Sequence, residues 1–165
     1  MSTQPTACTL KTVALLEGIR KEILSLVEGL TEEEALRVPE GQRNCIHWHL
    51  GHMLHVQLAH WFVRRGEPLP VDLGFKKYFR DGMSPADYDA GIPTFARMLE
   101  VYREYSFGLA GKFGGILEAR LAQPFDYMHS RFETVADDLY LLVFHEGEHH
   151  PMVRRVLKGL GKCPG

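Results

Sequence analysis

The chain has 165 residues, a length typical of one domain with a full hydrophobic core, so a single domain over residues 1–165 is expected. A composition of 45% hydrophobic and 24% charged residues excludes a disordered chain, and a formal net charge of -2 argues against nucleic acid or an anionic membrane as partner. Cys8, Cys45 and Cys163 form no Cys-x-x-Cys pair, and no signal-like N-terminus or membrane-length apolar run occurs, which together predict a cytoplasmic protein with reduced thiols.

The first predicted helix covers residues 9–29, where apolar residues recur every three to four positions. Charged residues, among them Arg20, occupy the opposite side, so we expect this side to face solvent. Thr31 and Glu34 have capping-box spacing and predict a short helix that stops before Pro39.

The second long helix is predicted from about Cys45 to Arg65, with Asn44 as its N-cap and Gly66 as its stop. Its sequence is apolar almost all round, which indicates a helix buried on most sides.

The second half of the chain contains two further predicted long helices, capped by threonine at residues 94–110 and 134–159. Residues 66–93 are rich in proline and glycine and predict a long connection with one helical turn starting at Ser84. The stretch before the last helix is irregular, with strand character at residues 125–128. The sequence therefore predicts an all-α four-helix bundle with long crossover connections.

Histidine is the one residue type whose frequency departs from the ordinary composition, with nine residues, eight of which fall in three places. His145 and His149 are four residues apart on the last predicted helix, so their imidazoles lie one turn apart and about 40° apart in projection. Two such imidazoles can share one metal ion.

A third ligand is expected from the second helix, where His52 lies on the same stripe as apolar residues. His49 and Cys45 share one side of that helix with His52, so a Cys/His set is an alternative. Three imidazoles from two helices would leave open coordination positions, as in catalytic sites.

The remaining histidines are interpreted as structural or surface residues. His47 is expected on the surface, His55 in the core or at a rim, and His150 in solvent. His60 and His129 are expected to be structural, with His129 a weak candidate for the rim of the site.

The string from His145 to His149 also matches the His-Glu-x-x-His motif of zinc proteases. Few residues follow His149, and they contain no suitable downstream ligand, which disfavours a protease. Glu146 and Glu148 are candidate catalytic bases or partners of the ligands, although both also fit exposed helix carboxylates.

Taken in order, the segments from Leu30 to Glu34, Asn44 to His52 and Thr134 to His149 resemble the DinB-like superfamily of metal-binding four-helix bundles. The second segment resembles the family's Gly-His start to its second helix, and the third carries His-x-x-x-His. The resemblance implies His52, His145 and His149 as ligands. The family's Gly-Gln pair after the second of these histidines is replaced here by His150-Pro151, which puts any role of that Gln in doubt.

The resemblance also implies one divalent transition metal (zinc, nickel, iron or manganese) and a homodimer. Some relatives are thiol-dependent S-transferases or isomerases that use bacillithiol, mycothiol or glutathione, and others are described as metal-dependent hydrolases. The leading hypothesis is therefore a metal-dependent enzyme acting on a small molecule, with a low-molecular-weight thiol or water as nucleophile. Tyr127 and Arg131 are weak candidates for the mouth of the site.

The alternative is a non-catalytic, stress-associated protein whose metal joins two helices. A DNA-associated role, suggested by the family's damage-inducible label, has no support from the scattered pairs of basic residues.

Overall fold

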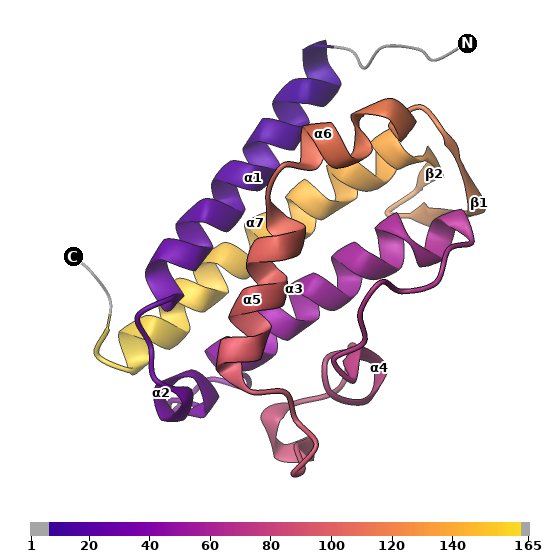
Figure 1. Ribbon diagram of the computed structural model, residues 1–165. Helices are drawn as coiled ribbons and strands as arrows, with labels where there is room; N and C mark the ends of the chain where they lie inside the picture. Colours follow the sequence, from indigo (N-terminus) through magenta and orange to yellow (C-terminus); the bar gives the residue numbers. More distant parts are fainter. Residues whose placement is uncertain (1–6, 163–165) are drawn as a thin grey trace.

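The computed structural model describes residues 7–162, which form a mostly helical protein with one small antiparallel sheet (Figure 1). The α-helices within these residues are α1 (Ala7–Val27), α2 (Glu32–Leu36), α3 (Ile46–Trp61), α4 (Phe75–Tyr78), α5 (Phe95–Ser106), α6 (Leu109–Phe113) and α7 (Val135–Gly159). The strands are β1 (Arg120–Tyr127) and β2 (Ser130–Thr134), and the short 3-10 helices are η1 (Val63–Arg65), η2 (Pro85–Asp87) and η3 (Gly114–Ile116).

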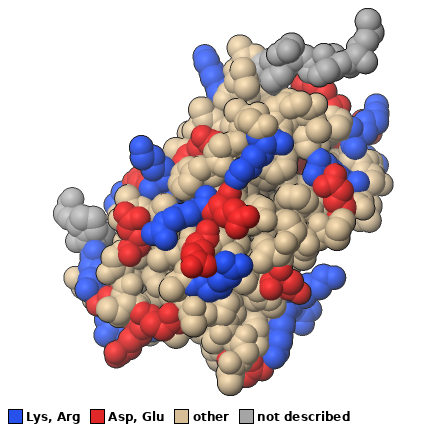
Figure 2. All heavy atoms as spheres, in the orientation of Figure 1, with Lys and Arg blue, Asp and Glu red and all other residues tan. Residues whose placement is uncertain are grey.

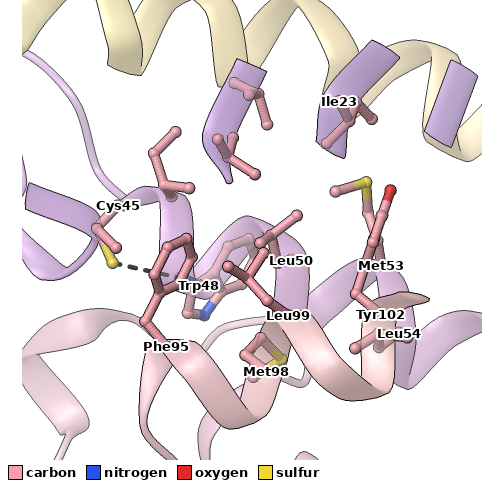
Figure 3. Close-up of a cluster of buried hydrophobic side chains, with 14 of the residues drawn as sticks. Ile23, Cys45, Trp48, Leu50, Met53, Leu54, Phe95, Met98, Leu99 and Tyr102 are labelled. Atoms are coloured by element: carbon pink, nitrogen blue, oxygen red, sulfur yellow. Dashed lines mark hydrogen bonds between the residues drawn. The ribbon is translucent and has the colours of Figure 1, made fainter. Parts of the chain in front are cut away.

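The four long helices contact one another in a ring: α1 packs on α7, α7 on α3, α3 on α5, and α5 on α1. Figure 1 shows α1 and α7 side by side in the same direction, with α3 running the opposite way. Apolar side chains of α3 and α5 interlock in the larger core cluster (Figure 3), including Leu50, Met53, Met98 and Tyr102. This packing fixes the faces of α3 and α7 that turn toward each other.

Three of the predicted helix starts are confirmed in detail. The side chains of Thr31, Thr94 and Thr134 each accept a hydrogen bond from the backbone N–H three residues later. At Thr31 and Thr134 the reciprocal bond of a capping box is also present. These caps satisfy N–H groups that a helix start leaves without partners.

The predicted start of α3 is wrong by one residue. Cys45, not Asn44, is the N-cap, and its Sγ accepts a hydrogen bond from the backbone N–H of Trp48 at 3.4 Å (Figure 3). The helix ends at Trp61, after which η1 leads to Gly66 with φ +83°. Glycine adopts this left-handed conformation without a steric cost, so Gly66 ends the helical segment as predicted.

The third long helix is shorter than predicted. α5 ends at Ser106, and Gly108 then adopts φ +71° and starts the separate helix α6. The predicted turn of helix after Ser84 is present as η2, whereas α4 was not anticipated.

The all-α class that the sequence predicts is incomplete, because the structure also contains a β-hairpin. The predicted strand character at residues 125–128 is part of β1, which pairs with β2 in the register Phe125 to Phe132 and Tyr127 to Ser130. The connecting residues Met128 and His129 have φ of +45° and +63°. The hairpin contacts η1 and the first part of α7, at the end of α3.

No helix in the described part of the chain has the length and apolar character needed to cross a bilayer. On the face shown in Figure 2, basic and acidic side chains are interspersed.

Candidate metal centre

Three histidines from two helices converge between α3 and α7. Nε2 of His52 on α3 lies 3.1 Å from Nε2 of His145 on α7, and the ring centroids of His145 and His149 are 4.5 Å apart. One potential ligand nitrogen from each of the three lies within 4.8 Å of the others. Nitrogens on one tetrahedral zinc are about 3.3 Å apart, given zinc–nitrogen bonds of about 2.0–2.1 Å. These three residues can therefore hold one metal ion.

His52 is oriented from behind by the backbone. Its Nδ1 lies 2.7 Å from the carbonyl oxygen of Phe79, which can only accept, so Nδ1 carries the proton. The indole of Trp48 stacks on the same ring at 4.7 Å, nearly parallel to it. The lone pair of Nε2 is thereby free to face His145 and His149, as the tautomer of a ligating histidine requires.

His149 is oriented by a fourth histidine. Nδ1 of buried His49 lies 2.9 Å from Nδ1 of His149, so one of these nitrogens donates and the other accepts. This contact leaves Nε2 of His149 for a metal. His49 therefore stands behind a candidate ligand, whereas the sequence left open whether it joins the ligand set.

Cys45, the other alternative ligand, is a buried helix cap. Burial raises the pKa of its thiol to about 11, so the group stays protonated at neutral pH. Because a metal binds the thiolate, this environment does not favour Cys45 as a ligand.

Burial keeps the candidate ligand histidines neutral. It lowers the pKa of His145 to about 3, and that of His149 to about 2, with the neighbouring imidazoles adding to both effects. Nδ1 of His145 is buried and has no hydrogen-bond partner among the described residues. Neutral imidazoles with unpaired nitrogens are the donor set that a divalent cation requires, so the residues fit such an ion.

A cavity of about 560 Å³ opens beside the three histidines. Its walls come from α3, α7, the hairpin and the loop after α4, and its lining residues are His52, Val56, His60, Arg64, Asp81, Phe125, Asp126, Tyr127, Leu141, Phe144, His145, Glu148 and His149. The volume suits a small molecule bound next to a metal ion.

Asp81 adds a carboxylate to this wall. Its Oδ1 lies 3.6 Å from Nε2 of His52, and its side chain is 98% exposed. Asp81 could not be selected from the sequence, because it lies in the irregular connection between α4 and η2.

The two candidate catalytic carboxylates lie in different environments. Glu148 lines the cavity and is exposed. Glu146 is fully buried, and its Oε1 accepts a hydrogen bond from the guanidinium of Arg20 at 2.5 Å. Arg20 was expected on the solvent-facing side of α1, and that expectation is wrong. For Glu146, the alternative of an exposed helix carboxylate is wrong as well, because its side chain is buried against Arg20.

The other histidines differ in part from the predictions. His47 is buried with Nε2 2.8 Å from the carbonyl oxygen of Pro93, so its predicted surface position is wrong. His60 contacts Oδ1 of buried Asp138 through Nδ1 at 3.1 Å. His150 is not simply solvated: its Nε2 lies 3.1 Å from Glu22.

Residues near the mouth of the cavity come from the hairpin. Tyr127 lines the cavity, whereas the guanidinium of Arg131 pairs with Asp126 at 3.0 Å. His129 lies at the exposed tip of the hairpin and does not line the cavity.

No curated protein is significantly similar to this chain. A model of the DinB superfamily matches residues 15–153, a range that contains all three converging histidines and extends from α1 into α7. The protein belongs to the DinB superfamily.

Proposed function

We propose that this DinB-superfamily protein is a metal-dependent enzyme that acts on a small molecule, either by transfer of a thiol or by hydrolysis. The observation that carries the proposal is the convergence of His52, His145 and His149 at the wall of an open cavity of about 560 Å³. One divalent ion of zinc, nickel, iron or manganese fits this donor set, since imidazole accepts most first-row metals.

A divalent ion held by three neutral imidazoles keeps its full charge and acidifies a bound water or thiol. Closed structural zinc sites have four protein ligands, whereas catalytic sites have three and an open position. The cavity supplies the space for a small molecule at that open position.

Two residues hold the imidazoles in place from behind. The backbone carbonyl oxygen of Phe79 accepts a hydrogen bond from His52 Nδ1, and Nδ1 of His49 contacts Nδ1 of His149. Such partners fix the tautomer and the ring orientation of metal-ligating histidines.

Glu148 is the proposed proton acceptor. It is one residue before His149 and lines the cavity, so a nucleophile entering the cavity can reach its carboxylate. Glu146 is the weaker of the two candidates, because its carboxylate is directed at Arg20 in the core.

A second candidate function is a non-catalytic protein in which a metal joins α3 to α7. The position of Asp81 favours it, since a carboxylate 3.6 Å from His52 Nε2 can complete a four-ligand shell. A closed shell of three imidazoles and one carboxylate would leave no open position for a substrate.

We also propose that the chain folds as a four-helix bundle and forms a homodimer, as expected for the family. The contacts among α1, α3, α5 and α7 support a four-helix bundle, with the hairpin as an addition at one end. The homodimer is proposed because the protein belongs to the family. Its molar mass in solution, measured by light scattering, tests this.

Activity after metal loading tests the proposal. Apoprotein loaded with zinc or nickel is offered a thiol with an electrophile, and separately an activated ester. Product should form only with metal, be lost in His145→Ala, and fall in Glu148→Gln while that variant keeps its metal. Two results together would favour the structural alternative. The protein would hold a full equivalent of metal and form no product, and proton relaxation of the manganese-loaded protein would show no exchangeable water on the metal.

A further inference from the structure

The lining of the cavity extends beyond the three histidines, along α3 and into η1. His52, Val56 and His60 on α3 line it together with Arg64 on η1, and each of the four follows the one before by four residues, so successive lining residues are neighbours one turn apart. Residues 52 and 64 are twelve positions apart, which corresponds to about 18 Å of helix rise, so the lining extends along this segment from the candidate ligand His52 to Arg64.

Arg64 is a half-buried cation with open hydrogen-bond donors. Its guanidinium lies 3.5 Å from the ring centroid of Phe125 on β1, a cation–π contact that holds the group at the cavity wall. Within residues 7–162, no carboxylate forms an ion pair or hydrogen bond with it. Neighbouring Arg65, by contrast, pairs with Glu67 at 2.6 Å.

Burial makes this unpaired charge costly. It lowers the pKa of the Arg64 guanidinium below its ordinary value, and the nearby charge of Asp138 opposes that effect. Asp138 itself contacts His60 at 3.1 Å. An anion entering the cavity would therefore meet a guanidinium that lacks a paired carboxylate of its own.

The acidic residues of the cavity lie elsewhere. Asp81 and Glu148 are next to the histidines, through the 3.6 Å contact with His52 and through sequence adjacency to His149. Asp126 is paired with Arg131 at 3.0 Å. The cavity is thus acidic at the histidine end and basic at the Arg64 end.

Apolar side chains line the wall between the two ends. Val56 contributes from α3, Leu141 and Phe144 from α7, and Phe125 from the hairpin. A chain of methylene groups or a ring placed here would bury apolar surface.

We propose that the substrate is an elongated small molecule with its reacting group at the histidines, an apolar middle and a terminal carboxylate bound by Arg64. This inference rests on the proposed function for the reacting end of the molecule. The planar fork of a guanidinium matches a carboxylate with two parallel hydrogen bonds, which gives Arg64 the role of a specificity-determining residue.

Matched thiols test the proposal by titration calorimetry on the zinc-loaded full chain. Mercaptooctanoate should bind about tenfold tighter than mercaptooctanol, as expected for one charge-assisted pair. Mercaptopropionate and mercaptopropanol should bind alike, because the short carboxylate does not reach Arg64. Arg64→Gln should abolish the preference within the long pair and leave the affinity for the alcohol unchanged.

A matched control removes the same charge elsewhere. Arg155 is exposed on α7 and does not line the cavity, so Arg155→Gln should keep the preference. Arg64→Lys should keep part of the preference for the carboxylate, because the positive charge remains but the two parallel donors of the guanidinium are lost. Equal affinities within the long pair, or a preference that persists in Arg64→Gln, would overturn the proposal.

Failure of the metal site is recognised separately. If zinc does not improve the binding of either long thiol, the thiol-transfer form of the proposed function fails, and octanoate and octanol are then compared on metal-free protein. A preference for octanoate that Arg64→Gln removes would still support the carboxylate site, and no preference would refute it.

Discussion

The carbonyl oxygen of Phe79 accepts a hydrogen bond from His52 across 2.7 Å, and the ring of Phe79 lies on Gly51. A Cβ at position 51 would stand 2.3 Å from two carbons of that ring, much closer than atoms can approach. The missing side chain of Gly51 therefore lets the segment after α4 reach α3 and orient a candidate ligand. Phe79 is the C-cap of α4, so the end of this short helix lies against α3 at Gly51.

Gly51→Ala should weaken metal binding although position 51 carries no ligand atom. The methyl group displaces Phe79, so His52 loses the acceptor that fixes its tautomer, and we expect about a 10–100-fold loss of metal affinity. Overpacking should also destabilise the fold by about 1–3 kcal/mol. Competition with a chromogenic chelator and urea unfolding measure the two effects.

Gly147→Ala is the matched control on α7. Nothing lies within 4 Å of a Cβ built at Gly147, although it stands between His145 and His149 in sequence. Metal affinity should be unchanged, and stability should rise by about 0.5–1 kcal/mol because alanine favours the helix. Equal metal affinities in both alanine variants would contradict the role assigned to Phe79.

His49→Phe should retain the metal but bind it less tightly. The substitution removes the partner of His149 Nδ1 while keeping a ring in the buried position. An orienting role predicts one equivalent of metal with an affinity lowered about 10–100-fold. Complete loss of metal at saturating concentration would instead identify His49 as a ligand.

The buried pair Arg20–Glu146 should stabilise the fold without contributing to the metal site. Glu146→Ala leaves a buried guanidinium without its partner and should cost about 3–5 kcal/mol by urea unfolding. The double variant Arg20→Met/Glu146→Leu removes both charges and should recover most of that loss. Metal content should equal that of the wild type in both, and metal loss in a stably folded double variant would count against this assignment.

Two substitutions in the hairpin turn should increase the stability of the protein. Met128 and His129 both adopt positive φ, a conformation that favours Asn-Gly in a two-residue hairpin turn. Met128→Asn/His129→Gly should raise the free energy of unfolding by about 1 kcal/mol, since each side chain is strained there. An unchanged or lower stability would show that contacts of Met128 or His129 outweigh the strain.

The sequence predicts the long helices well because their signals are local. Threonine caps and three-to-four apolar spacing depend on residues within one or two turns, and the caps at Thr94 and Thr134 are confirmed. The hairpin was only partly predicted, because Met128-His129 carries no asparagine or glycine turn signal.

The surroundings of the site depend on contacts between distant residues. The spacing of His145 and His149 is visible in the sequence, but Phe79 meets His52 across 27 positions and Arg20 meets Glu146 across 126. A buried arginine on α1 cannot be distinguished from a surface arginine by periodicity, since its partner is unknown. Asp81 and Arg64 were not selected for the same reason.

The most direct measurement is the metal content of protein purified without an affinity tag, compared with that of His52→Ala and His149→Ala. These two ligands come from different helices, so a shared ion requires both. We expect about one equivalent of divalent metal in the wild type and loss of that metal in both variants, with the helical content measured by circular dichroism unchanged. Metal kept at full affinity in His52→Ala, or no metal in the wild type after reconstitution, would contradict a metal site shared by α3 and α7.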